Sequence, residues 1–170
     1  MKKIKVILLF AFVAILCVSC SKDDDGSKSN TPEGVPTGEV VAVSQRSLVL
    51  TGFDDANMGK SLNNTQKWWL YDYGEIISDC DEYSQDLDED IYIGFLPDGE
   101  LKYLDMDGNH LYSRTWAWGP GQNSVTLDGN TMVQYEFTAL NEDEIIYYSS
   151  TDLFDCNITT YEKLHEPYYE

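Results

Sequence analysis

Aromatic side chains spaced two residues apart are the residues of this sequence best suited to bind a ligand. Tyr112, Trp116 and Trp118 fall at alternating positions, and Trp69 lies in a second dense aromatic run. Alternate residues of a β-strand share one face, so Trp116 and Trp118 are expected side by side with Tyr112. Such a face can stack on a sugar ring or an apolar ligand, but it can equally fill the core of a small barrel. The spacing leaves both interpretations open.

No group of residues matches a catalytic motif. The two histidines, His110 and His165, stand apart, and the sequence has neither a Gly-x-Ser-x-Gly nucleophile turn nor a phosphate-binding loop. The acidic run 86–90 has the alternating aspartates of a calcium loop, but Ile91 stands where the loop requires glycine. We therefore predict a protein that is not an enzyme and has no cofactor, no catalytic residues and no metal site.

The charge balance restricts the class of partner. The chain of 170 residues has 30 acidic and 11 basic residues, a net charge of -19. Nucleic-acid binding needs clustered Lys and Arg, which this sequence lacks, so we expect no nucleic-acid partner. A strongly acidic surface could instead attract a basic protein, because opposite charge speeds and orients encounter.

Residues 1–19 have the architecture of an export signal. Lys2, Lys3 and Lys5 precede an apolar run of 13 residues, Val6–Val18. A membrane-spanning helix needs about 20 apolar residues, so this run is too short to span. The pattern predicts a signal peptide.

The end of this run, Leu16-Cys17-Val18-Ser19-Cys20, resembles the lipobox of bacterial lipoproteins. Cys20 matches the lipidated cysteine, and Val18 and Ser19 match the small residues before it, whereas Cys17 departs from the usual Leu. The resemblance implies that Cys20 carries acyl chains such as palmitate, which anchor the protein stably in a membrane. Lipidation of Cys17 is the weaker alternative.

The residues after Cys20, Ser-Lys-Asp-Asp-Asp-Gly, resemble the surface-export signal of Bacteroidota-type lipoproteins. This resemblance implies an outer-membrane lipoprotein exposed on the cell surface. An inward-facing outer-membrane lipoprotein is the alternative.

Cys80 and Cys156 remain once the other two cysteines are assigned to the signal and the anchor. A single pair of cysteines in an exported protein favours a disulfide. Two buried free thiols are the alternative, and zinc would need more ligands than the sequence places nearby.

The composition divides the rest of the chain into a flexible linker, residues 20–38, and a folded domain, residues 39–170. The linker is rich in Ser, Asp, Gly and Pro, and the domain has three Asp-Gly turns between short apolar stretches. Within 132–140, Val133, Tyr135, Phe137 and Ala139 alternate with polar residues and predict one buried face. We expect a loop or short helical turn at 53–59 and no amphipathic helix longer than two turns. The expected strands are 40–50, 66–73, 91–96, 101–104, 111–118, 124–127, 132–140, 145–149 and 158–164.

The order of motifs from residue 67 onward resembles the lipocalin-like domains of Bacteroidota lipoproteins. These motifs are KWWLYDY (67–73), SDCDEY (78–83), YIGFLPDGEL (92–101), TWAWGPGQNSVTLDG (115–129), FTALNEDEIIY (137–147) and ITTYEKL (158–164). The resemblance implies an all-β protein: a small antiparallel lipocalin-like β-barrel.

The sequence thus predicts a lipid-anchored outer-membrane or cell-surface lipoprotein whose barrel binds a small apolar or carbohydrate ligand without chemistry. The candidate binding residues are Tyr112, Trp116, Trp118 and Trp69. The alternative is an acidic interaction or inhibitor module that binds a basic protein such as lysozyme.

Overall fold

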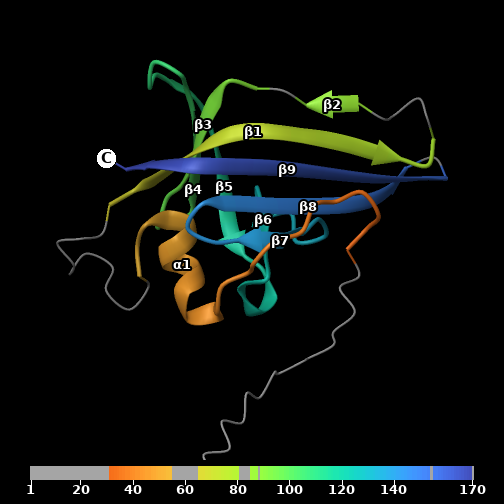
Figure 1. The fold of residues 1–170 in the computed structure, drawn as a ribbon, viewed down its shortest axis with the longest axis horizontal. Helices are drawn as coiled ribbons and strands as arrows, with labels where there is room; N and C mark the ends of the chain where they lie inside the picture. Colours follow the sequence, from red (N-terminus) through yellow and green to blue (C-terminus); the bar gives the residue numbers. More distant parts are fainter. Residues whose placement is uncertain (1–30, 55–64, 81–84, 88, 154, 170) are drawn as a thin grey trace, which may run out of the picture. The chain divides into compact units, whose positions relative to one another are not determined.

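A computed structural model describes residues 31–54, 65–80, 85–87, 89–153 and 155–169 (Figure 1). The predicted signal peptide, Cys20 and most of the predicted linker lie outside these residues. The elements are α1 (Val43–Thr51), β1 (Lys67–Ser78), β2 (Gln85–Leu87), β3 (Ile91–Phe95), β4 (Glu100–Asp105), β5 (His110–Trp118), the 3₁₀ turn η3 (Pro120–Gln122), β6 (Ser124–Leu127), β7 (Tyr135–Leu140), β8 (Glu144–Leu153) and β9 (Cys156–Tyr169).

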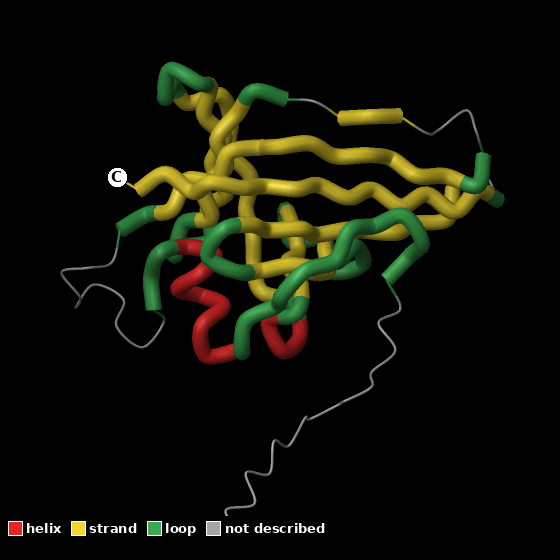
Figure 2. Tube along the Cα trace, in the orientation of Figure 1, coloured by secondary structure: helices red, strands yellow, loops and turns green. Residues whose placement is uncertain are grey.

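The strands form a closed antiparallel barrel (Figure 2). From β3 to β9 each strand pairs with the next one along the chain, and β9 returns to pair with β1. Among the described residues, β1 and β3–β9 make an eight-stranded barrel, while β2 pairs with β1 at Gly74–Ile76 only. The structure therefore confirms the predicted all-β antiparallel barrel.

The expected strand at 40–50 was wrong, because most of this segment is the helix α1 (Val43–Thr51). β1 and β9 close the barrel, and of this segment only Val40 pairs with a strand, through a parallel bridge to Leu140 of β7. The segment instead buries Val49 and Leu50 in the core, with exposed fractions of 2% and 0%. Gly52 ends the helix at φ 85°, a left-handed conformation that suits glycine.

Arg46 and Leu50 fix α1 across one end of the barrel. The Arg46 guanidinium donates to the backbone oxygens of Val41, Gly121 and Gln122 and to Asn123 Oδ1. The Leu50 carbonyl accepts a hydrogen bond of 3.0 Å from Trp69 Nε1 inside the barrel. α1 therefore closes this end of the barrel.

The compact unit begins at Thr31, earlier than the boundary at residue 39 expected from composition. Val35 is buried with Tyr148, Tyr161 and Ile77 on the outer face of the barrel. Two hydrogen bonds link Gly38 and Pro36 to Thr138 at 2.9 and 2.8 Å. The Pro and Gly content of this stretch therefore marks an extended segment that packs on the barrel.

A bulge in β7 (Tyr135–Leu140) reverses the predicted alternation of faces. Phe137 pairs with Tyr147, but the next pair is Ala139 with Ile146, which shifts the register by one residue. Leu140 therefore joins the interior cluster with Phe137, and Ala139 is buried outside that cluster. A slip of one residue moves every later side chain to the other face.

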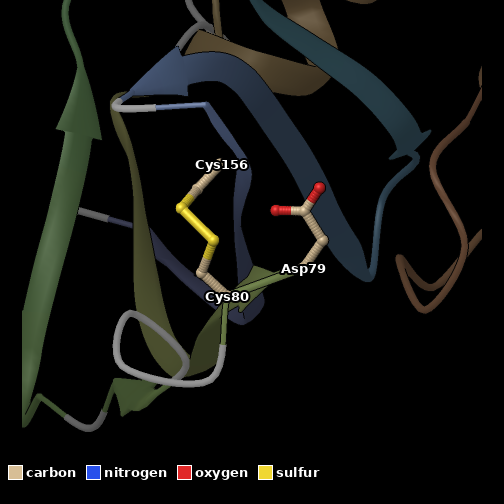
Figure 3. Close-up of side chains that lie close together, drawn as sticks. All are labelled: Asp79, Cys80 and Cys156. Atoms are coloured by element: carbon tan, nitrogen blue, oxygen red, sulfur yellow. A yellow bond between two sulfur atoms is a disulfide. The ribbon is translucent and has the colours of Figure 1, made fainter.

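The predicted Cys80–Cys156 disulfide is present (Figure 3). Cys80 follows the end of β1 and Cys156 begins β9, with Cα atoms 5.8 Å apart. The bond thus joins two neighbouring strands whose cysteines are 76 residues apart in sequence. No helix of the described residues is long and apolar enough to cross a membrane.

Replacing both cysteines, Cys80→Ala with Cys156→Ala, should lower the free energy of unfolding by roughly 4–5 kcal/mol, because the unfolded chain regains the entropy of an open loop. Urea denaturation of the oxidised protein and of the variant would measure the loss. Reducing the wild-type protein should produce a similar loss, whereas reduction of the variant should have no effect. Equal stability of the oxidised protein and the variant would contradict this account.

Candidate functional site

Two of the predicted binding residues, Trp69 and Trp116, form the apolar floor of the barrel. Trp69 has an exposed fraction of 0% and Trp116 of 8%. Each indole nitrogen already donates to a backbone oxygen, Trp69 to Leu50 at 3.0 Å and Trp116 to Leu96 at 2.9 Å. With no donor free and little surface exposed, these rings pack the core.

Trp116 and Trp118 lie side by side as expected, with ring centroids 5.4 Å apart. They stand at the end of β5 where α1 crosses the barrel, and a shallow groove of about 300 Å³ separates Trp116 and Trp118 from Ser47 and Thr51 of the helix. The end of β5 that Gly119-Pro120-Gly121 follows is therefore the barrel end that α1 covers.

Tyr112 is the predicted residue that faces solvent. Its exposed fraction is 47%, and its ring stacks on Tyr103 with centroids 4.2 Å apart and an interplanar angle of 18°. Tyr103 itself is buried, with an exposed fraction of 8%. The pair sits toward the barrel end opposite α1, which we call the mouth and which includes the turns 106–109 and 128–134.

A carboxylate, Glu162, lies in the interior near this tyrosine pair. Glu162 is partly buried on β9 and accepts a hydrogen bond from the Tyr147 hydroxyl. Tyr147 itself belongs to the buried cluster inside the barrel. Burial raises the pKa of the Glu162 carboxyl, and the negative charge of Glu89 adds to this effect. The Tyr147 hydrogen bond and the charge of Arg114 act in the opposite direction.

Arg114 completes the group but is already paired. Its Nε donates to Asp128 Oδ2 at 2.8 Å, and Asp128 also accepts from the Thr115 backbone at 3.1 Å. These two hydrogen bonds lower the pKa of Asp128, and the bond from the Thr115 backbone has the larger effect. The guanidinium is thereby oriented by a carboxylate at the rim of the mouth.

We call these five residues the polar layer: Tyr103, Tyr112, Arg114, Tyr147 and Glu162. Burial is the largest cause that raises the pKa values of the Tyr103, Tyr112 and Tyr147 hydroxyls. The negative charge of Glu162 raises these pKa values further. The tyrosines therefore stay neutral hydrogen-bond donors near a carboxylate. The arrangement can hold a polar or charged ligand group at the mouth, above the apolar floor.

The sequence analysis missed Glu162, although a signal was present. Glu162 and Leu164 are two residues apart on β9, so they share one face, and Leu164 is fully buried. An acidic residue in phase with buried leucine indicates an inward-facing carboxylate.

The remaining candidates for chemistry are committed elsewhere. His110 Nε2 lies 2.8 Å from Ser113 Oγ, but that hydroxyl donates to Glu100 at 2.7 Å, and all three groups are at the surface. Asp79 lies close to Cys80 and Cys156 (Figure 3), yet both sulfur atoms are joined in the disulfide and cannot act as thiolate ligands.

No family model, curated protein or solved structure matches this chain. The functional conclusion therefore depends on the site itself.

Replacing Glu162 by the neutral Gln should change how stability depends on pH. The pKa of Glu162 is higher in the folded state than in the unfolded chain, so the folded state keeps this proton to a higher pH. The contribution of Glu162 to the free energy of unfolding is therefore largest at low pH and is lost as the pH rises through the raised pKa. Glu162→Gln should therefore gain stability relative to wild type as pH rises from about 4.

Chemical denaturation of both proteins across this pH range would measure the difference. Glu75→Gln is the matched control, because Glu75 on β1 accepts a hydrogen bond from Tyr161 on β9, on the outer face of the barrel. A pH-independent difference between wild type and Glu162→Gln would contradict the assignment.

Proposed function

We propose that this protein is a lipid-anchored lipoprotein of the outer membrane, exposed on the cell surface, whose lipocalin-like barrel binds a small ligand without chemistry. The anchor is supported by the signal architecture and by the lipobox-like residues that end at Cys20. The binding role is supported above all by the polar layer inside the barrel.

A polar layer is costly inside a small barrel that serves only as a scaffold. Burying a hydroxyl or a carboxylate loses its hydration, and the loss is recovered only in part by hydrogen bonds. The other end of the same barrel is filled by apolar rings, so the fold can be packed without such groups. Titratable groups with shifted pKa values that lie close together are typical of functional sites.

Solvent reaches the polar layer from the mouth. Arg114 and Glu162 are partly buried, and Tyr112 is exposed. Met106, Leu111 and Met132 are exposed apolar side chains at the same end, with exposed fractions of 49%, 47% and 94%. Exposed apolar side chains around a polar site provide contact surface for a ligand that is partly apolar.

A second candidate function is an acidic module that binds a basic protein. It is favoured by the net charge of -19 and by Glu142 and Asp143 in the exposed β7–β8 turn. Charge-driven protein binding weakens as salt increases, whereas binding of a small apolar ligand hardly responds. The salt dependence of any partner's affinity separates the two functions.

Cys20→Ala should move the protein from the membrane fraction to the soluble fraction and abolish labelling by an alkyne-tagged palmitate analogue. Without acyl chains nothing in the proposed anchor holds the chain to lipid. Cys17→Ala is the matched control and should keep both label and location. Persistent labelling of Cys20→Ala would contradict the assignment and point to Cys17.

The neutral fluorescent probe N-phenyl-1-naphthylamine should bind the purified full chain saturably, with a rise in emission. Tyr112→Ala should weaken probe binding while leaving the unfolding midpoint nearly unchanged, because Tyr112 is exposed. Trp69→Ala should instead destabilise the fold by about 3–5 kcal/mol, as expected for a buried ring.

Tyr73→Ala is the control for the probe experiment, since Tyr73 is exposed on β1 and packs edge-on against Tyr161 in the outer cluster. This variant should keep probe binding. Equal loss from Tyr73→Ala and Tyr112→Ala, or no saturable binding to the wild type, would overturn binding at the mouth.

A further inference from the structure

The charges of the polar layer do not balance. Arg114 is the cation of the layer, and Asp128 already pairs with it at 2.8 Å. Glu162 has no ion pair among the described residues, and the charge of Glu89 acts on both Glu162 and Tyr112. After the Arg114–Asp128 pair is counted, the charges of Glu162 and Glu89 act on this region without a matching cation in the polar layer.

Glu162 also has unused hydrogen-bonding capacity. A carboxylate has about four acceptor positions on two oxygens. Within the described part of the chain, its one hydrogen bond is the Tyr147 hydroxyl on Oε2. Oε1 can therefore accept from a donor that a ligand brings.

The tyrosines add a second attraction for positive charge. Tyr103 covers one face of the Tyr112 ring, and Tyr112 remains 47% exposed. The face of an aromatic ring is negative and attracts a cation, by about 0.5–1 kcal/mol at exposed sites and more when water is excluded. Tyr135 and Tyr147 form another ring pair of this interior, with centroids 5.9 Å apart.

The kind of cation follows from these ligating groups. Calcium takes six to eight oxygen ligands and magnesium keeps several waters. The polar layer offers one carboxylate, Glu162, and neutral phenols, and the charge of Glu89 acts on it from nearby. An organic ammonium group, weakly hydrated and attached to a carbon skeleton, suits a carboxylate beside aromatic faces better than a metal ion does.

We propose that the ligand of this barrel is a small organic cation whose ammonium group lies between the Glu162 carboxylate and the exposed ring of Tyr112. This inference rests on the proposed binding function and names the chemistry of its ligand. Glu162 supplies the opposite charge, Tyr112 supplies the aromatic face, and the exposed apolar side chains of Met106 and Met132 at the mouth contact the carbon skeleton. Arg114, held by Asp128, excludes a second cationic group from that side of the mouth.

Two pairs of probes isolate the effect of charge. Choline and 3,3-dimethylbutan-1-ol have the same shape and differ in charge, and 2-phenylethylammonium is compared with 2-phenylethanol. Calorimetric titration of the purified full chain at constant ionic strength should give the cation at least a tenfold lower Kd than its neutral counterpart in one or both pairs. Neutral probes that bind as well as the cations in both pairs would overturn the proposal.

Variants locate the effect at the polar layer. Glu162→Gln keeps shape and hydrogen bonding but removes the charge, so it should lose the tenfold preference while still binding N-phenyl-1-naphthylamine. Glu75→Gln, the matched change at the outer Tyr161–Glu75 hydrogen bond, should keep the preference. A preference that persists in Glu162→Gln would overturn the role of Glu162.

The two experiments fail independently. Binding of the neutral probe without any preference for cations would leave the barrel as a ligand-binding protein and reject only the cation. Absence of both would reject the binding function itself. A calcium titration adds one more outcome, since calcium binding that competes with choline would replace the organic cation by a metal ion.

Discussion

The pairing of β1 with β9 is the constraint on which the rest of this structure depends. Its register runs from Lys67 opposite Tyr169 to Ser78 opposite Ile158, nearly the full length of both strands. Strand edges expose unpaired backbone groups, and this ladder removes the edge that a meander would leave on each side. Closure creates an interior. The segment before β1 makes a single parallel bridge, Val40 with Leu140, and then folds as α1 over the barrel end.

The interior that closure creates has two ends with different chemistry. At the α1 end, indole nitrogens are bonded to backbone oxygens and aromatic rings pack edge to face, as Phe95 does on Trp116 at 5.5 Å. At the mouth, hydroxyl, guanidinium and carboxylate groups are close together. The Tyr–Glu hydrogen bond recurs on the outer face, at Tyr148–Glu136 and Tyr161–Glu75, where it ties neighbouring strands. Inside the barrel the same bond orients a carboxylate toward the region that a ligand would occupy.

The sequence predicted those parts of the fold that are encoded locally. Asp-Gly turns and alternating side chains located most of the hairpins, and β6 was expected at 124–127, where the structure has Ser124–Leu127. What failed depends on non-local pairing. Val40–Leu50 has the composition of a strand, but only Val40 bridges to β7 and Val43–Thr51 is helical. Leu140 replaces Ala139 in the core because of a bulge that alternation alone does not reveal. The same limit applies to the site. The tryptophans were visible as a motif, but only the closed barrel shows that Trp69 is sealed and Glu162 is accessible.

The disulfide has a mechanical consequence. It joins Cys80 to Cys156 across neighbouring strands and so encloses the 76-residue separation that contains β2 to β8. A chain pulled from its two ends transmits the load through that bond, and the enclosed strands add nothing to its extension. Under tension, only the parts outside the loop can lengthen: the segment that packs Val35 on the outer face, α1, β1 and β9. The enclosed hairpins, which include Tyr112 and Arg114, are shielded from direct force. The polar layer is thus built mainly on the part of the chain that a pull on the two ends does not load, and Glu162 is its one member outside that closed loop.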